Sequence, residues 1–478
     1  MDKVLRLLGM RYATAALMLV AVAALYGAAT FSRPGGASEK GRTAPVAHAV
    51  MVCPGHEGGR LAVQSLSQKG GGRVDMTPTR GGSPVASMAT AGQSWEKDTK
   101  SGQDSYTLRA TGAIAAGLEA EQTTHRGGGP DRGLAGARCA TPGTDLWFMS
   151  PGPDSADDLD LYLTNVDGQR ASVNLSALSG EGPLDTPEGQ AILVEPYTTR
   201  IVRIGDSAEG LGDIVQSAAA LTLRVQTTSG RVAASVRARI GKKKGIEWLP
   251  QSPRPAASVV VPGVPGGDGQ RRLLVSVPGE ADARIKVQVI TPGGAFAPQG
   301  QDVLDAPAKT VTAVPLTGAL SGKAAAVRLV ADRPVIAGFA ATRGADVAYG
   351  TATAPLTASA PGVAADNRFD SSLILTAPFG AATVRIVTMN AAGKGAPQDV
   401  AIEAGRTVEA ELTAPGEGGT SYAAVITPKP GSGPVYASRV LGKGKGDDYL
   451  FTVLPITPAP MTFHLPDTAD SQTALTPG

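Results

Sequence analysis

The sequence has few cysteine, histidine and aromatic residues. Among its 478 residues are two cysteines and four histidines, and aromatic residues make up 4%. Two cysteines that are not spaced as Cys-x-x-Cys do not match the usual pattern of a structural zinc site. Because aromatic side chains are scarce, the hydrophobic cores must be built from Val, Leu, Ile and Ala. We expect neither a bound metal nor another cofactor.

The sequence also lacks an excess of one charge. It contains 44 basic and 42 acidic residues, so its formal net charge is +2. Nucleic-acid-binding proteins normally carry a strong basic excess on one face. The balance therefore gives no electrostatic basis for nucleic-acid binding, and we expect no nucleic-acid partner.

No familiar catalytic motif is present. The patterns HExxH, GxSxG and the Walker phosphate loop are all missing from the sequence. Residues 94–97 match the SxxK pattern of penicillin-binding enzymes, but the companion KTG and SDN motifs are absent. We predict that the protein is not an enzyme and has no catalytic residues. The enzymatic alternative is a polysaccharide hydrolase with paired carboxylates, for which the sequence identifies no pair.

A repeated pattern is the strongest feature that is present. A β-branched residue, any residue, Ala, and then Gly or Ser recur in four places, at intervals of 118, 103 and 100 residues. The four copies are residues 114–118, 232–236, 335–339 and 435–439. A period near 100 residues is too long for the common solenoid repeats and fits whole β-sandwich domains in tandem. The clearest copy lies in residues 327–344, which we interpret as a β-hairpin with a turn at residues 332–334.

These observations predict an all-β protein of about four tandem immunoglobulin-like β-sandwich modules. The 61 glycines and 36 prolines, together with 42% hydrophobic residues, are typical of turn-rich globular protein rather than disorder. The expected segments are a cytoplasmic basic segment (1–12), a transmembrane helix or signal anchor (13–31), a linker (32–45), β-module one (46–140), β-module two (141–250), a Pro/Gly-rich connector (251–270), β-module three (271–355), a linker (356–366), β-module four (367–458) and a disordered tail (459–478).

Residues 13–31 predict how the protein is localised. This stretch of 19 residues carries no charge and can just span a bilayer as a helix. The preceding Lys3, Arg6 and Arg11 place the N-terminus in the cytoplasm and the rest of the chain outside. We therefore expect a single-pass membrane protein whose bulk is extracytoplasmic. The alternative is a cleaved signal peptide and a secreted protein.

The two cysteines predict a disulfide. Cys53 lies in the first predicted strand of module one, and Cys139 lies near the end of the same module. Terminal strands of a sandwich can lie close together, and the space beyond the membrane permits disulfides. We predict a Cys53–Cys139 bond; the alternative is two buried free thiols.

Two further groups are candidate binding residues. Trp95 lies in a polar stretch and is the best candidate for contact with a carbohydrate ligand. Asp154, Asp157, Asp158 and Asp160 form an acidic cluster before a predicted strand. Such a cluster could bind calcium weakly, although it lacks the order of an EF-hand loop; the alternative is a solvated loop.

Some of these residues carry a resemblance to a known family. The basic and apolar N-terminus, the segment 52–55 and the strands at 334–337 and 434–437 resemble an actinobacterial family of membrane-anchored or secreted proteins of unknown function, built of immunoglobulin-like repeats. The resemblance covers nearly the whole chain. It implies a role in the cell envelope and supplies no catalytic residues.

We therefore weigh three functions. The first is a non-catalytic cell-envelope protein, a membrane-anchored extracytoplasmic scaffold or interaction module whose partners are envelope proteins or cell-wall polymer. The second is a carbohydrate-binding protein that recognises cell-wall polymer. The third is a polysaccharide-active hydrolase.

Overall fold

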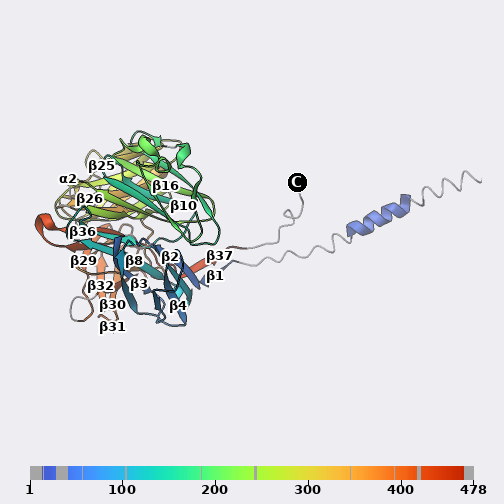
Figure 1. The fold of residues 1–478 in the computed structure, drawn as a ribbon, viewed down its shortest axis with the longest axis horizontal. Coiled ribbons are helices and arrows are strands. Elements are labelled where there is room, and N and C mark those ends of the chain that lie inside the picture. Colours follow the sequence, from blue (N-terminus) through green and yellow to red (C-terminus); the bar gives the residue numbers. More distant parts are fainter. Residues whose placement is uncertain are drawn as a thin grey trace, which may run out of the picture. The chain divides into compact units, whose positions relative to one another are not determined.

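The computed structural model, shown in Figure 1, describes most of the chain. The described residues are 13, 15–27, 41–55, 57–102, 105–184, 186–241, 245–344, 346–391, 393–416 and 421–467. Residues 15–27 are helical. Within the described part of the chain, no helix has both the length and the apolar character needed to cross a membrane. Segment 1–12, residues 28–31 of the predicted span and most of the linker lie outside the described residues.

The chain divides into two compact units, residues 1–45 with 462–478 and residues 46–461. In the first unit, β1 (Arg42–Pro45) pairs antiparallel with β37 (Thr462–Leu465). These strands lie in the predicted linker and tail, where the sequence indicated no regular structure.

The second unit is built almost entirely of antiparallel strands, as the sequence predicts, and we divide it into four modules in chain order. Module one contains β2 (His48–Cys53), β3 (Glu57–Ser65), β4 (Gly72–Pro78), β5 (Ala86–Met88), β6 (Ser94–Ser101), β7 (Tyr106–Gly112), β8 (Leu118–Arg126) and β9 (Gly133–Arg138). Module two contains β10 (Asp145–Pro151), β11 (Asp158–Thr164), β12 (Ala171–Leu178), β13 (Pro183–Leu184), β14 (Ile192–Val194), β15 (Thr199–Arg203), β16 (Ala220–Ser229), β17 (Ala233–Ile240), β18 (Gly245–Leu249) and β19 (Gln251–Ser252).

The other two modules follow the same plan. Module three contains β20 (Ala256–Val264), β21 (Arg271–Val277), β22 (Ala283–Thr291), β23 (Gly294–Phe296), β24 (Val303–Ala306), β25 (Thr310–Pro315), the one-turn helix α2 (Thr317–Leu320), β26 (Ala325–Arg343) and β27 (Asp346–Thr351). Module four contains β28 (Gly362–Ala364), β29 (Asp370–Ala377), β30 (Ala382–Asn390), β31 (Gly393–Lys394), β32 (Gln398–Ile402), β33 (Arg406–Glu411), β34 (Ala423–Pro428), β35 (Tyr436–Lys443) and β36 (Leu450–Ile456).

Each module pairs its strands into two sheets with the same topology. In one sheet the first strands β2, β10, β20 and β28 pair with β7, β16, the first part of β26 and β34, respectively. The other sheet ends on β9, β18, β27 or β36. Its order is β6-β3-β8-β9 in module one, β15-β11-β17-β18 in module two, β25-β21-β26-β27 in module three and β33-β29-β35-β36 in module four. Each module has a hydrophobic core, made mainly of Val, Leu, Ile and Ala as the composition predicts.

The predicted hairpin at residues 327–344 is wrong. These residues belong to one continuous strand, β26, whose first part pairs with β20 and β22 and whose second part pairs with β21 and β27. Pro334 lies where the strand leaves one sheet and enters the other, and this position has no ladder partner. Because proline has no N–H to donate, it is tolerated at such a crossing.

The same crossing occurs in the other modules. The chain passes between the two sheets from β7 to β8, from β16 to β17 and from β34 to β35. The repeated sequence therefore marks the passage between the sheets of a sandwich, not a hairpin. The first copy, residues 114–118, is also wrong as a strand, because Ala113–Ala115 forms a 3-10 turn and β8 begins at Leu118.

The small residues of the repeat allow neighbouring strands to approach. Ala337 lies in the core of module three, and Gly338 faces the opposite way. A Cβ atom at Gly338 would lie 2.6 Å from the carbonyl oxygen of Gly350 and 3.4 Å from Met149 Sδ in module two. Glycine is therefore required for the close approach of β26 to β27.

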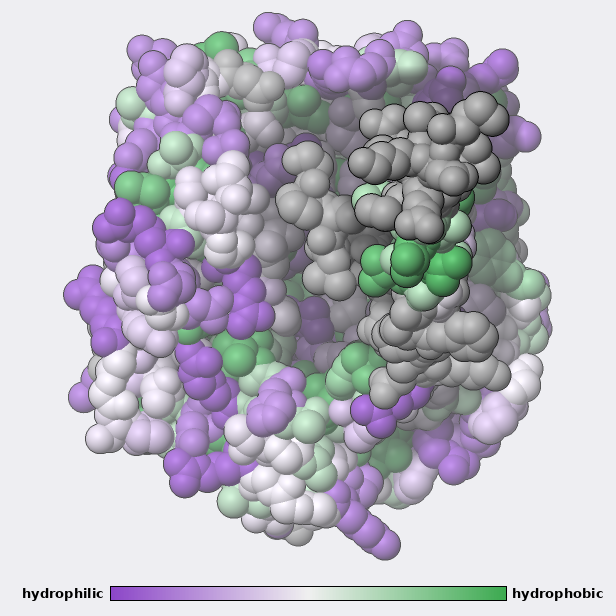
Figure 2. Space-filling model, turned by 90° about the vertical axis from the view of Figure 1, so that its right-hand side faces the viewer, coloured by the Kyte–Doolittle hydropathy of each residue, from purple (hydrophilic) through white to green (hydrophobic). Residues whose placement is uncertain are grey.

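The four modules close into a ring. A small hydrophobic cluster joins each module to the next, and another joins module four back to module one. These clusters centre on Val52 and Ala233 (modules one and two), Trp147 and Leu274 (two and three), Val260 and Tyr436 (three and four) and Val363 and Ala62 (four and one). Polar residues predominate on the face shown in Figure 2, with small apolar groups between them.

Candidate ligand site on the ring axis

One end strand of a sheet from each of the four modules lies at the centre of the ring. These axial strands, β9, β18, β27 and β36, contact one another in a closed cycle. Each is an edge strand of its sheet, so some of its backbone N–H groups lack a ladder partner. A buried N–H group without an acceptor is costly, so the axis must supply acceptors.

Two buried carboxylates provide some of these hydrogen-bond acceptors. Glu247 Oε1 accepts hydrogen bonds from the Gly136 N–H (3.3 Å), the Trp248 N–H (2.9 Å) and Thr452 Oγ1 (3.1 Å). Asp346 Oδ2 accepts from the Phe451 N–H (2.9 Å) and the Leu134 N–H (3.4 Å). The two side chains thus link all four axial strands.

These carboxylates stand in an unusual electrostatic environment. Burial raises the pKa of Asp346 to about 8, although backbone N–H groups favour its charged form. Burial also raises the pKa of Glu247 well above its usual range, and nearby Asp346 raises it further. Both groups are therefore more basic in the folded protein than in the unfolded chain.

The protein is expected to lose stability as the pH rises from about 5 to 8. A carboxyl group with a raised folded-state pKa stabilises the fold fully below its unfolded pKa, and that contribution is lost as the pH rises through the folded value. For Asp346 alone the loss is at most about 1.4 kcal/mol per pH unit. Urea unfolding at several pH values measures it. Asp346→Asn should flatten the dependence, and an equal slope in both proteins would contradict this assignment.

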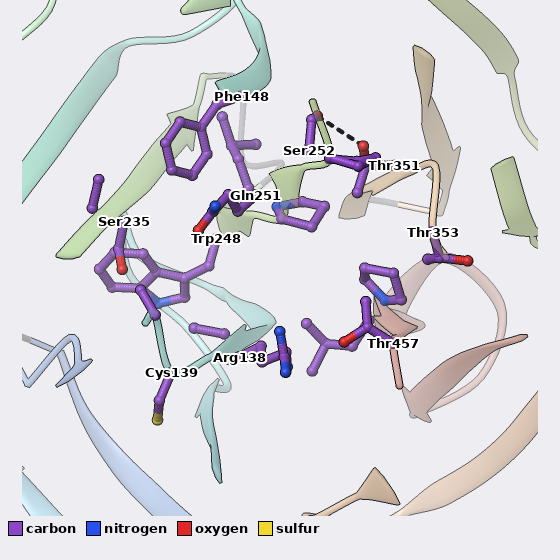
Figure 3. Close-up of a pocket in the computed structure, with 18 of the residues that line it drawn as sticks. Arg138, Cys139, Phe148, Ser235, Trp248, Gln251, Ser252, Thr351, Thr353 and Thr457 are labelled. Carbon is purple, nitrogen blue, oxygen red and sulfur yellow. Dashed lines mark hydrogen bonds between the residues drawn. The ribbon is translucent and has the colours of Figure 1, made fainter. Parts of the chain in front are cut away.

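A pocket of about 270 Å³ lies at the C-terminal ends of the axial strands. Figure 3 shows these strand ends converging around it. Its wall includes apolar residues from modules one, two and four, among them Phe148, Trp248, Leu249 and Leu454. Polar groups lie between them. They are Arg138, Thr141, Ser235, Gln251, Ser252, Thr351, Thr353 and Thr457.

Arg138 is a charged residue in the wall of the pocket. Its Nε and Nη2 donate to the two carboxylate oxygens of Glu119 at 2.7 and 2.5 Å. The Arg138 side chain is 35% exposed, whereas that of Glu119 is 3% exposed. Burial raises the pKa of Glu119, although the attraction of Arg138 opposes this. A guanidinium has five N–H donors, so three of those on Arg138 have no partner among the described residues.

Other polar atoms of the pocket wall are also unsatisfied. Trp248 Nε1, Thr353 Oγ1 and Thr457 Oγ1 are buried and have no hydrogen-bond partner within the described part of the chain. By contrast, the hydroxyl groups of Ser252 and Thr351 bond to each other at 2.8 Å (Figure 3). Unpartnered buried polar groups are rare in native proteins, and each calls for water or a ligand. The pocket wall is therefore suited to a ligand rich in hydrogen-bond acceptors.

Comparison with protein families identifies the chain. Residues 94–413, two thirds of the sequence, match the family of unknown function DUF5719. The chain belongs to this family. No curated protein and no solved structure matches it. The match confirms only that the chain belongs to a family of unknown function, and it includes the Arg138 and Trp248 positions of the pocket.

The structure of this DUF5719 member confirms the predicted disulfide between Cys53 and Cys139. Both cysteines are buried, and Cys139 also lines the axial pocket. The bond joins the end of β2 to the residue that follows β9, so it fastens the two sheets of module one together. A disulfide is typical of an extracytoplasmic compartment.

The other candidate residues lie away from the pocket. Trp95, in β6, is half-buried and packs against the core of module one. Among the four aspartates, Asp157 and Asp158 pair with Arg239, and Asp160 pairs with Arg203 at 2.9 Å. In the described residues, no group of three or more acidic, histidine or cysteine side chains is placed to hold a metal ion.

The sequence did not reveal Arg138 or Trp248 as site residues. Trp248 is 3% exposed, with its ring 5.3 Å from that of Tyr162, and a tryptophan in an apolar strand resembles an ordinary core residue. One signal was available: in the strand GIEWL a glutamate directly precedes the tryptophan. Since strand residues alternate between faces, one of the two faces of β18 has to accommodate a carboxylate.

Proposed function

We propose that this protein is a non-catalytic cell-envelope protein that acts as a membrane-anchored extracytoplasmic scaffold or interaction module. The observation that carries the proposal is the axial pocket, where groups from all four modules converge and leave hydrogen-bond donors unused. Binding sites are often formed where domains meet. Residues 46–461 would present this pocket outside the membrane, with residues 13–31 as the anchor.

Two further observations support the proposal. The Cys53–Cys139 disulfide suits a compartment outside the cytoplasm. The uncharged stretch at residues 13–31, preceded by basic residues, suits a single membrane span with a cytoplasmic N-terminus. The expected partners are envelope proteins or cell-wall polymer.

Binding of a carbohydrate polymer is the second candidate, because the pocket combines an indole ring with hydroxyl and amide groups. Aromatic faces and planar polar groups are the usual means of holding a small polar ligand in a defined orientation. In this version of the proposal the relevant tryptophan is Trp248 in the pocket, or Trp95 on module one.

Co-sedimentation of the purified full-length protein with isolated cell-wall material tests the proposal. We expect retention on the wall, and a soluble glycan that competes it away would favour the carbohydrate candidate. Trp248→Phe and Trp95→Phe would show which tryptophan contributes. If the protein neither sediments with wall material nor captures an envelope protein in a membrane pull-down, the proposed function is wrong.

A further inference from the structure

We propose that the axial pocket binds the carboxylate of a ring-sized ligand through the free edge of Arg138. The ligand class is a sugar acid or similar cyclic monocarboxylate, either free or as one residue of a polymer. This inference rests on the binding role proposed above and specifies its chemistry. It is carried by the size of the pocket, by its charge and by its unsatisfied donors.

The volume of the pocket sets the size of the ligand. A volume of about 270 Å³ is large enough for several water molecules. A ligand of roughly ten non-hydrogen atoms, about one six-membered ring with its substituents, would replace that water. Phe148, Leu249 and Leu454 contribute apolar surface to the wall of the pocket.

The guanidinium group of Arg138 indicates which kind of ligand the pocket can hold. Arg138 is cationic, and no acidic side chain lies in the pocket wall among the described residues. Glu119 occupies one edge of the guanidinium, which leaves the Nη1 amino group and one N–H of Nη2 for a ligand. Guanidinium groups pair well with planar carboxylates. Because Glu119 already balances the charge of Arg138, the free N–H groups, and not a net positive charge, would hold the carboxylate, and a monoanion fits better than a dianion.

The unsatisfied donors explain why an oxygen-rich ligand is favoured over an apolar one. Figure 3 shows the Thr457 side chain with its hydroxyl oxygen turned toward the side where the Arg138 guanidinium lies. The Trp248 N–H and the Thr457 hydroxyl are both buried and without partners in the described structure. An apolar ligand would leave the free N–H groups of Arg138 without an acceptor, which is unfavourable, whereas carboxylate or ring oxygens can accept from them.

Direct binding to the purified full-length protein tests the inference. Isothermal titration calorimetry with glucuronate, glucose and a short glucuronate oligomer separates the contributions. We expect glucuronate to bind at least about tenfold more tightly than glucose, because hydrogen bonds to a charged group are the strong ones. Tighter binding of the oligomer would assign the ligand to a polymer, and binding of the free acid alone would assign it to a soluble metabolite.

Conservative variants locate the binding site. Arg138→Lys keeps a cation beside Glu119 but removes the planar donor edge, and Thr457→Val removes only a hydroxyl. Each should weaken glucuronate binding about tenfold and leave the weak binding of glucose less affected. The matched control is Arg60→Lys, since Arg60 also pairs with a carboxylate, Asp98 at 2.9 Å, on the same sheet but outside the pocket. It should bind glucuronate as the unmodified protein does.

Equal binding of glucuronate and glucose, or no binding of either, would overturn the inference and leave the pocket as a water-filled junction. Failure of this inference can be told apart from failure of the proposed function. If wall material still retains the protein while glucuronate does not bind, only the carboxylate assignment is wrong. If Arg60→Lys weakens binding as much as Arg138→Lys, the ligand binds elsewhere and the pocket assignment is wrong.

Discussion

Replacement of Arg439 by alanine is expected to destabilise the folded protein by about 3–5 kcal/mol. Arg439 lies on β35 of module four and is fully buried. Its Nη1 lies 3.0 Å from Glu121 Oε2 on β8 of module one and also donates to the backbone carbonyl of Asp366. The variant would leave the Glu121 carboxylate buried without its cation, at the junction that closes the ring. Urea unfolding measures the change.

A double variant tests how much of the destabilisation comes from the unpaired Glu121 carboxylate. Two nitrogens of Arg439, Nε and Nη2, are buried without partners among the described residues, so the pair itself carries a desolvation cost. Arg439→Met together with Glu121→Gln keeps the side-chain volume, removes both charges and retains an acceptor for the Asp366 N–H. We expect the double variant to be more stable than Arg439→Ala. Equal destabilisation would show that loss of the hydrogen bond from Arg439 to the Asp366 carbonyl, which both variants lack, dominates.

Removal of the disulfide is expected to destabilise the protein by up to about 4–5 kcal/mol. The bonded cysteines are separated by 86 residues, and a cross-link that closes a loop of this size restricts the unfolded chain strongly on the chain-entropy model. The double variant Cys53→Ala with Cys139→Ala tests this by thermal unfolding.

The control is the effect of a reducing agent. Dithiothreitol should lower the melting temperature of the unmodified protein and leave that of the double variant unchanged. Because Cys139 lines the axial pocket, the double variant should also weaken ligand binding at temperatures where the rest of the protein remains folded. A melting temperature that the double substitution does not change would contradict the expected contribution.

Residue patterns that depend on local chemistry predicted this structure well. Alternating Val, Leu and Ile with turn residues between them indicated antiparallel β-structure, and two cysteines in one module allowed one pairing. The prediction of a turn at Asp332-Arg333-Pro334 was wrong. A proline that interrupts the hydrogen bonds of a strand gives the same local sequence pattern at a turn and at a crossing between sheets. Only the pairing partners of β26 distinguish the two.

The ring and its pocket could not be predicted in the same way. Closure of the ring depends on strands that are buried on both faces, such as β10, in which six of seven residues are buried. That pattern shows that something packs against the second face of the strand, but it does not show which module does so. Likewise, Glu247 and Asp346 become hydrogen-bond acceptors only because edge strands more than 100 residues distant meet them on the axis.

Closure of the ring also constrains the order of events during synthesis. The N–H of Val46, where the ring begins, bonds to the carbonyl of Met461, where it ends, at 3.0 Å. After modules one to three have been translated, the ring is therefore still open on one side. There the surface of module one that contacts module four, which includes Glu121, still faces solvent. Module four, the last part of the ring to be translated, covers that surface. The stability of the finished protein thus depends on a segment that is translated after modules one to three, and a chain cut short before module four would keep three sandwiches but lose the axis.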